Sequence, residues 1–531
     1  SHAYRNSPPS YWSRDGLAKR PLNIANVRDD GIYVGNYSKG YEVLQTSGRR
    51  ITNNLIVDGF EASGSLTTQF IRQLNPVFSS GSWIKDGSPI TSSGDGDPLN
   101  DQLGRSVSIS SDGTIIAAGM PASDDPLSAA GSILIFKSSS LGWYQDGPPM
   151  TSSDGTGDTS DQLGFSVSIN SNGTIIAAGS PNSDILGSNS GFVVIFKSSS
   201  LGWYQDGPQL TSNDGTGDAF DNLGFSISIN SDGTIIAAGS ALSDVPGSSA
   251  GSVVIFKSSS LGWYQDGPQL TSSDATGDVS DRLGQSVTIN SDGTIVAAGS
   301  ILSDVPGSSA GSVIVFKSSS LGWYQDGPQL TSSDGAGDTI DELGSSVSIN
   351  SNGTIIAAGS PRTDVPGSSA GSVVIFKSSS LGWYQDGPQL TSSDDVGTTF
   401  DLLGSSVSIN SDGTIIAAGS PDSDVPGSAA GSVVIFKSSS LGWYQDGLQL
   451  TASDGAGTTF DLLGRSVAIN GDGNIVAAGW PSSDVPSSSA GSVIVFKSFS
   501  FESLEILEKA NYSLPNLTAT GETVIVERFN A

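Results

Sequence analysis

The sequence predicts an all-β protein: a seven-bladed β-propeller of four-stranded blades, built from 60-residue repeats, with non-repeat segments at both ends. Three observations support this prediction. The same 60-residue unit occurs seven times between residues 81 and 500, with no insertion or deletion. Each unit contains four strand-like segments separated by turn residues. The repeats are rich in Asp, Ser and Gly and contain one Glu, Glu342, a composition that suits strands and turns rather than helices.

Two motifs mark the period. The tryptophans of the repeat are spaced 60 residues apart, at Trp83, Trp143, Trp203, Trp263, Trp323, Trp383 and Trp443. A turn motif of the form DGTI(I/V)AAG, with small variants, begins at Asp112, Asn172, Asp232, Asp292, Asn352, Asp412 and Asp472. A fixed period of this length indicates one supersecondary unit that packs against its own copies.

The first two strands of a unit are predicted to form a hairpin. SVSIN (166–170) alternates small polar and apolar residues, as a half-buried strand does. The dipeptide Asn172-Gly173 that follows is a strong hairpin turn signal. TIIAAG (234–239) is almost entirely apolar, which indicates a strand covered on both faces.

The third and fourth strands complete the unit. A loop rich in Pro, Gly and Ser leads to GSVVIFK (251–257), a segment with the β-branched residues that favour strands. LGWYQDGPQLT (261–271) is predicted to be an edge-like fourth strand, because it contains Pro and large aromatic residues. A loop over 272–284 leads into the next unit.

The order of the segments favours a closed ring over an open solenoid. The array begins with a fourth-strand sequence, GSWIKDGSPIT (81–91), and ends with a third strand, GSVIVFK (491–497). Pairing these two segments would close the ring and remove an exposed sheet edge. A solenoid would need polar capping repeats, whereas the first and last units here match the middle ones closely.

The repeat resembles the FG-GAP family, the β-propeller repeats similar to the integrin α-subunit head, in a longer bacterial and algal form. The motifs that carry the resemblance are W-Y-Q-D-G-P-Q-L, D-x-L-G-x-S-V-S-I, N-S-D-G-T-I-I-A-A-G-S-P and A-G-S-V-V-I-F-K. LGFS (163–166) stands for the FG element and AAGSP (177–181) for the GAP element. The resemblance covers residues 81–500 and implies an extracellular, non-enzymatic adhesion, ligand-binding or structural module.

Calcium-binding members of that family have a D-x-D-x-D-G loop between the first two strands. Calcium needs several oxygen ligands, and here the loop is NSDGT or NSNGT, with at most one carboxylate. The resemblance therefore implies no calcium site at this turn.

The loop between units is the better candidate for calcium. Three copies of an Asp triad provide carboxylates there: Asp154, Asp158, Asp161, Asp214, Asp218, Asp221, Asp274, Asp278 and Asp281. One interpretation is a weak calcium site supported by backbone carbonyls. The alternative is that each Asp caps a turn by accepting backbone N–H groups. In the last two loops Thr398 and Thr458 replace the middle carboxylate, and no other cofactor is predicted.

Three further features have an open interpretation. A second set of Asp residues is expected either to bind cations or a basic partner on one face, or to stabilise its own loop: Asp124, Asp184, Asp244, Asp304, Asp364, Asp424 and Asp484. The Trp203-Tyr204 pair either stacks on sugars or packs on the neighbouring blade. Glycosylation sequons occur at Asn36, Asn172, Asn352, Asn511 and Asn516.

The composition excludes several function classes. The chain has no Cys and one His, His2, so it cannot use thiol catalysis, a His triad or a multi-His metal site. The net charge is −30, which argues against binding nucleic acid through phosphates. No apolar stretch is long enough to span a membrane. A leader peptide would not be visible, because the sequence begins at Ser1 rather than at Met.

The two ends differ from the repeats in charge. Residues 1–80 hold nine bases and six acids, a net charge of +3, whereas residues 81–500 hold 12 bases and 42 acids, a net charge of −30. Residues 501–531 contain a possible helix, FESLEILEKA, and a strand-like ETVIVERFNA (522–531). One hypothesis is self-association through 1–80 and 522–531. The alternative is that both ends fold back on their own propeller or link to other domains.

Taken alone, the sequence favours an extracellular, non-enzymatic structural or adhesion protein that assembles into a surface filament. The alternative is a secreted, multivalent, lectin-like binder of a glycan or cell-surface ligand. Both interpretations rest on near-identical blades, because a site for one ligand needs a blade that differs. The same near-identity argues against an enzyme.

Overall fold

The computed structural model describes 32–36 and 40–44 near the N-terminus and, in the repeats, 82–93, 100–124, 129–152, 160–212, 220–272, 280–305, 307–332, 340–365, 367–392, 400–425, 429–452, 461–485 and 487–499. The chain divides into two compact units, 1–82 with 500–531, and 83–499. In the first unit, β1 (Ile32–Asn36) pairs antiparallel with β2 (Gly40–Leu44). The segments predicted at 501–510 and 522–531 lie outside the described residues.

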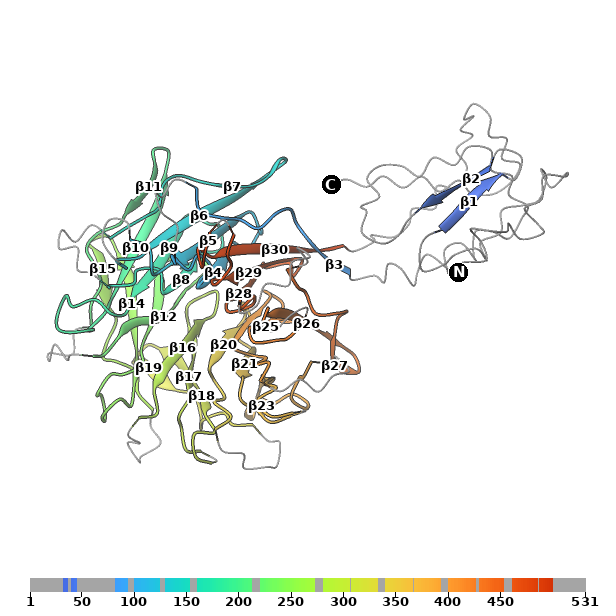
Figure 1. The fold of residues 1–531 in the computed structure, drawn as a ribbon. Coiled ribbons are helices and arrows are strands. Elements are labelled where there is room, and N and C mark those ends of the chain that lie inside the picture. The colour runs from blue at the N-terminus through green and yellow to red at the C-terminus, as the bar shows by residue number, and fades with distance from the viewer. Residues whose placement is uncertain are drawn as a thin grey trace, which may run out of the picture. The chain divides into compact units, whose positions relative to one another are not determined.

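Seven four-stranded antiparallel sheets form a ring, as the blades of a β-propeller (Figure 1). The first strands are β4 (Ser106–Ile109), β8 (Ser166–Ile169), β12 (Leu223–Ile229), β16 (Leu283–Ile289), β20 (Ser346–Ile349), β24 (Ser406–Ile409) and β28 (Val467–Ile469). The second strands are β5 (Ile115–Met120), β9 (Ile175–Ser180), β13 (Ile235–Ser240), β17 (Ile295–Ser300), β21 (Ile355–Ser360), β25 (Ile415–Ser420) and β29 (Ile475–Trp480).

The outer half of each blade is a second hairpin. The third strands are β6 (Ser132–Ser139), β10 (Phe192–Ser199), β14 (Ser252–Ser259), β18 (Ser312–Ser319), β22 (Ser372–Ser379), β26 (Ser432–Ser439) and β30 (Ser492–Phe499). The fourth strands are β7 (Gly142–Gln145), β11 (Gly202–Gln205), β15 (Gly262–Gln265), β19 (Gly322–Gln325), β23 (Gly382–Gln385), β27 (Gly442–Gln445) and β3 (Ser82–Lys85). We number the blades 1 to 7 from β4–β7 to β28–β30 with β3. The predicted fold class is therefore confirmed.

The seventh blade is completed by the N-terminal end of the array. Its strand order is β28-β29-β30-β3, so β3 pairs with the last strand of the repeats. Backbone hydrogen bonds of 2.7 Å from Asp86 N to Val495 O and of 2.8 Å from Ile90 N to Val493 O continue this pairing. The predicted closure of the ring is confirmed.

The fourth strands are shorter than predicted. The segment expected over 261–271 forms a strand only to Gln265, and Leu270 then pairs with Val253 through an isolated bridge. Gly267 lies between them with a φ of +85°, a conformation that interrupts a regular ladder. The outer edge is thus broken into short pieces, which limits pairing with other chains.

The core lies between neighbouring blades. In β13 every residue after Ile235 is buried, as predicted for a strand covered on both faces. Gly239 of β13 contacts the next blade so closely that an added Cβ would lie 1.9 Å from the carbonyl oxygen of Gly284. The Gly of the repeat therefore sets the spacing between sheets.

A three-residue contact links the outer strands of adjacent blades. Asp266 Oδ2 forms an ion pair of 2.7 Å with Lys257 Nζ of its own blade. The same oxygen accepts a hydrogen bond of 3.2 Å from Trp323 Nε1 of the next blade. The same contacts occur in all seven seams, with Trp–Asp distances of 3.0–3.4 Å and Lys–Asp distances of 2.7–2.8 Å. The Trp of the Trp-Tyr pair therefore packs in the seam, while Tyr264 is 48% exposed.

Candidate functional site

The inner hairpin of each blade has two ends. The residues at one end are nearly the same in all seven blades, whereas several residues at the other end differ from blade to blade. At one end lies the turn between the first and second strands. At the other end the first strand begins and the second strand finishes, as the pairing of Ser226 with Gly239 shows. The turn ends meet around the axis of the ring, where they form a pocket of about 180 Å³.

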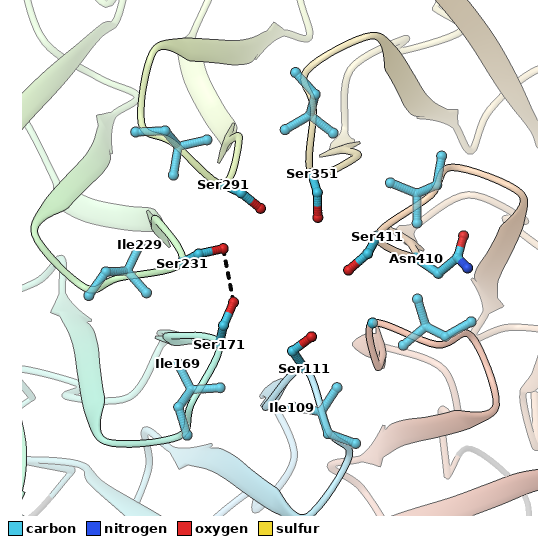
Figure 2. Close-up of a pocket in the computed structure, with 15 residues that line it drawn as sticks. Ile109, Ser111, Ile169, Ser171, Ile229, Ser231, Ser291, Ser351, Asn410 and Ser411 are labelled. Carbon is cyan, nitrogen blue, oxygen red and sulfur yellow. Dashed lines mark hydrogen bonds between the residues drawn. The ribbon is translucent and has the colours of Figure 1, made fainter.

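The pocket is surrounded by serine side chains that point toward the axis (Figure 2). A closed ring of seven backbone hydrogen bonds of 2.9–3.2 Å joins the turns through Ser111, Ser171, Ser231, Ser291, Ser351, Ser411 and Gly471. At the seventh position an added Cβ on Gly471 would lie 2.3 Å from Ser111 Oγ. The pocket lining consists of Ile, Ser, Asn and Gly and has no titratable group, so this end serves to close the ring.

The opposite end of the inner hairpins is where the blades differ. Several positions per blade vary there, and we call three of them, which lie at the ends of the first and second strands, the variable ring. The first position holds Gln102, Gln162, Asn222, Arg282, Glu342, Leu402 and Leu462. The second holds Arg105, Phe165, Phe225, Gln285, Ser345, Ser405 and Arg465. The third holds Ala122, Asn182, Leu242, Leu302, Arg362, Asp422 and Ser482.

Exposure alone does not explain which positions vary. The leucines at the tips of six outer hairpins are 97–98% exposed and do not vary: Leu141, Leu201, Leu261, Leu321, Leu381 and Leu441. Arg105, Phe165 and Phe225 are partly buried, yet their position differs from blade to blade. All four arginines of the repeat region, and its one glutamate, belong to the variable ring.

Side chains of the variable ring contact one another across blades 1 to 3. The Arg105 guanidinium lies over the Phe165 ring, with Cζ 4.5 Å from the ring centroid. The Phe165 and Phe225 rings follow at a centroid distance of 4.9 Å and an angle of 50°. Asn182 Nδ2 donates to Gln162 Oε1 at 2.8 Å, and Asn222 Nδ2 donates to Asn182 Oδ1 at 3.3 Å. The ring is thus one connected surface on this side.

A charged cluster occupies blades 4 and 5. Arg362 Nε forms an ion pair of 3.2 Å with Glu342 Oε1. Burial raises the pKa of Glu342, while the positive charges of Arg362 and Arg282 oppose that rise. The Glu342 carboxylate is thus paired with Arg362 and also interacts with the nearby charge of Arg282.

A second charged cluster lies where blades 6, 7 and 1 meet. Burial lowers the pKa of Arg105 to about 9, and the positive charge of Arg465 adds to this effect. Burial also lowers the pKa of Arg465, opposed by the charge of Asp422. Burial raises the pKa of Asp422, opposed by Arg465 and reinforced by Asp424. Arg105 is partly buried and Arg465 is exposed, and they lie at the start of the first strands of the neighbouring blades 1 and 7.

The predicted calcium triads are only partly within the described residues. Asp154, Asp158, Asp214, Asp218, Asp274 and Asp278 lie outside them. The third members, Asp161, Asp221 and Asp281, are buried, with exposed fractions of 7%, 4% and 6%. Over the described stretches of the chain, no group of three His, Cys, Asp or Glu side chains is placed to hold a metal ion. Calcium binding by these loops stays a prediction.

The second set of Asp residues stabilises its own loops. Asp244 Oδ1 accepts a hydrogen bond of 2.8 Å from the backbone N–H of Ser249. The other six copies accept an equivalent bond five residues on, at 2.7–2.9 Å. Of the two interpretations, the structure favours the local one.

Two of the sequon asparagines have a clear local role. Asn172 Oδ1 accepts a hydrogen bond of 2.5 Å from the Thr174 hydroxyl, and Asn352 Oδ1 accepts the same bond from Thr354. Asp232 makes this contact in another blade, so the Asn and the Asp residues are equivalent at the turn. The side chains of Asn36, Asn511 and Asn516 lie outside the described residues, and glycosylation stays a prediction.

The variable ring was not predicted, because the repeat was defined by the residues that its seven copies share. A comparison of the seven units position by position would have found it. Its three positions lie next to invariant residues such as Leu223, Gly224 and Gly239, which mark the start of the first strand and the end of the second.

Comparisons with known proteins show no family for this chain. No family profile and no curated protein matches the chain. A solved structure from Bacteroides uniformis, described as a putative 6-phosphogluconolactonase, is similar at 15% identity and a TM-score of 0.41, over 69% of this chain and 89% of that one. At this likeness it assigns no activity. The FG-GAP resemblance stays a prediction. The described part of the chain contains no helix with the length and hydrophobicity that a membrane crossing requires.

The function predicted from the sequence has to be corrected. None of these comparisons supports an extracellular adhesion or filament subunit, or a multivalent lectin-like binder. The physical premise of that prediction also fails. It required interchangeable blades, and the variable ring makes the blades unequal at one end of the axis.

Proposed function

We propose that this propeller binds one ligand per chain, and that the variable ring is its binding surface. The observation that supports the proposal is the distribution of sequence differences: they concentrate at one end of the inner hairpins and join into a connected set of side chains. Residues that only maintain the blade structure are expected to be alike in all seven blades. The differences in charge and size at this one end therefore indicate a further role. A site built from unequal blades offers one arrangement of groups, not seven.

The second position of the ring supplies a matched test. Ser345 and Ser405 occupy it in blades 5 and 6, where each hydroxyl donates to its own backbone, at 2.9 Å to Glu342 O and 2.8 Å to Leu402 O. Serine therefore satisfies the fold at this position. The variant R105S/F165S/F225S/Q285S/R465S has serine in all seven blades and should fold normally.

A ligand-observed NMR screen of a chemically diverse fragment library on the full chain tests the proposal. We expect hits that bind with a stoichiometry of one and lose at least tenfold in affinity in the serine variant. The control variant L141S/L201S/L261S/L321S/L381S changes five residues at the opposite end and should keep the hits. Binding that survives in the serine variant, or a stoichiometry of seven, would contradict the proposal.

A further inference from the structure

Blades 7 and 1 meet at the seam that closes the ring, and both have arginine at the second position of the variable ring. The seam is tight: Ser466 Oγ donates to Gly104 O at 2.8 Å, and Gly471 N donates to Ser111 O at 2.9 Å. These contacts hold the two first strands side by side. Arg105 and Arg465 therefore occupy equivalent positions on neighbouring strands.

Among the described residues, Arg105 has no compensating carboxylate, and Arg465 has only the nearby charge of Asp422. Arg362 is paired with Glu342, and the same carboxylate acts on Arg282. Among the residues that the structure describes, no carboxylate forms an ion pair with Arg105 or Arg465. Asp422 acts on Arg465 only as a nearby charge. Arg105 is partly buried and Arg465 is exposed, and two like charges on neighbouring strands repel each other unless a counter-charge is present.

The fold does not require arginine at either position. Serine occupies it in blades 5 and 6 and bonds to its own backbone. The Phe165 ring covers one side of the Arg105 guanidinium, which fixes that group in place without neutralising it. Two guanidinium groups on neighbouring strands can offer several N–H donors to a single oxyanion, a role that suits arginine better than lysine.

We propose that Arg105 and Arg465 bind one oxyanion group of the ligand, a sulfate, phosphate or carboxylate, at the seam between blades 7 and 1. The assignment rests on the proposed function, because it names the chemical class that part of the variable ring accepts. The charged cluster at Glu342 is a separate, internally compensated part of the same ring.

The test uses the full chain with sodium sulfate, inorganic phosphate and sodium acetate, each measured against sodium chloride at equal ionic strength. Isothermal titration calorimetry gives affinity and stoichiometry. We expect saturable binding of at least one of the three oxyanions at one per chain, and a thermal stabilisation that chloride does not give. The order of affinities among the three probes identifies which oxyanion source the seam prefers.

Matched variants distinguish a specific oxyanion site from nonspecific attraction of anions to positive charge. Arg105→Gln and Arg465→Gln should each weaken oxyanion binding at least tenfold. Lys317→Gln removes the same charge from blade 4, opposite the seam and outside the variable ring, and should change oxyanion affinity less than twofold. Arg105→Lys keeps the charge without the planar fork and should fall between wild type and Arg105→Gln.

Three outcomes would overturn the assignment. They are equal losses in all three Gln variants, full affinity in Arg105→Gln, or no preference for any oxyanion over chloride in the wild-type chain. If oxyanions fail while fragments still bind at the variable ring and are lost in the serine variant, the proposed function stands and only the oxyanion assignment fails. If both kinds of probe fail, the proposed function fails with it.

Discussion

At the scale of single residues, the backbone conformation just before the first strand of each blade is strained for some residue types and lowers the stability of the fold there. The residue there has a positive φ in every described blade: 66° for Asn100, 79° for Phe220 and 80° for Ile340. Asn accepts this conformation readily, whereas a β-branched residue is strained in it. Ile340 is in addition 51% exposed, so its side chain gains little from packing.

Replacing Ile340 with Asn should stabilise the protein by about 1 kcal/mol, because it relieves the strained backbone. The reciprocal change Asn100→Ile should destabilise by a similar amount. Thermal and urea unfolding of both variants measure the difference. A loss of stability in Ile340→Asn would show instead that the isoleucine contributes packing that outweighs its strain.

The lowered pKa of Arg105 predicts how oxyanion binding depends on pH. Binding needs the protonated guanidinium, and Arg105 loses its proton as the pH rises through about 9. The charge that acts on Arg105 is that of Arg465, which favours proton loss, and Asp422 in turn acts on Arg465 and favours its charged form. Sulfate affinity should therefore be constant near neutral pH and fall in more alkaline solution. Calorimetry across this range checks it, with Arg105→Gln expected to show little pH dependence.

The lowered pKa of Arg105 also means that its positive charge, which oxyanion binding needs, makes the folded protein less stable. The pKa of Arg105 in the fold lies below its ordinary value, so folding disfavours its protonated form. Without an oxyanion, Arg105→Gln should raise the free energy of unfolding at neutral pH by about 1 kcal/mol, after the lost contact with Phe165 is allowed for. This gain in stability, measured by urea unfolding, should accompany the loss of oxyanion affinity.

At the scale of elements, the packing of neighbouring sheets depends on small residues in the second strand. Gly239→Ala would place a Cβ 1.9 Å from the carbonyl oxygen of Gly284 in the next blade. Backbone cannot move aside there without disturbing the seam, so we expect a loss of about 3 kcal/mol. Gly267→Asn is the control, since Gly267 has a φ of +85° and no neighbour near its Cβ position. It should cost less than about 1 kcal/mol in thermal unfolding. Equal effects would contradict this explanation of the seams.

At the scale of the whole molecule, stability depends on the ring being closed by a strand from the start of the array. Removal of 1–92 deletes β3 and leaves the edge of β30 unpaired, whereas removal of 1–80 leaves the seventh blade complete. The longer deletion should lower the melting temperature and cause association through the open edge. Light scattering after size-exclusion chromatography measures both. A monomer of unchanged stability would show that β3 is dispensable.

The fold was predictable because it depends on local patterns that recur seven times. The alternation of SVSIN, the Asn172-Gly173 turn and the apolar TIIAAG segment specify strands, and the offset between the first and last segments specifies closure. The end of β15 at Gln265 was not predicted, since the interruption at Gly267 reflects a backbone conformation that the residue type permits but does not require.

The candidate site was not predictable in the same way. Arg105 and Arg465 are 360 positions apart in the sequence, and nothing near either one indicates that they are neighbours. Their charges interact because closure brings the seventh blade against the first. The sequence by itself determined the strands, the turns and the number of blades, because these follow from short-range pattern and period. Only the tertiary structure decided that unequal residues from distant repeats form one surface, because the ring places equivalent positions of all blades around a single axis.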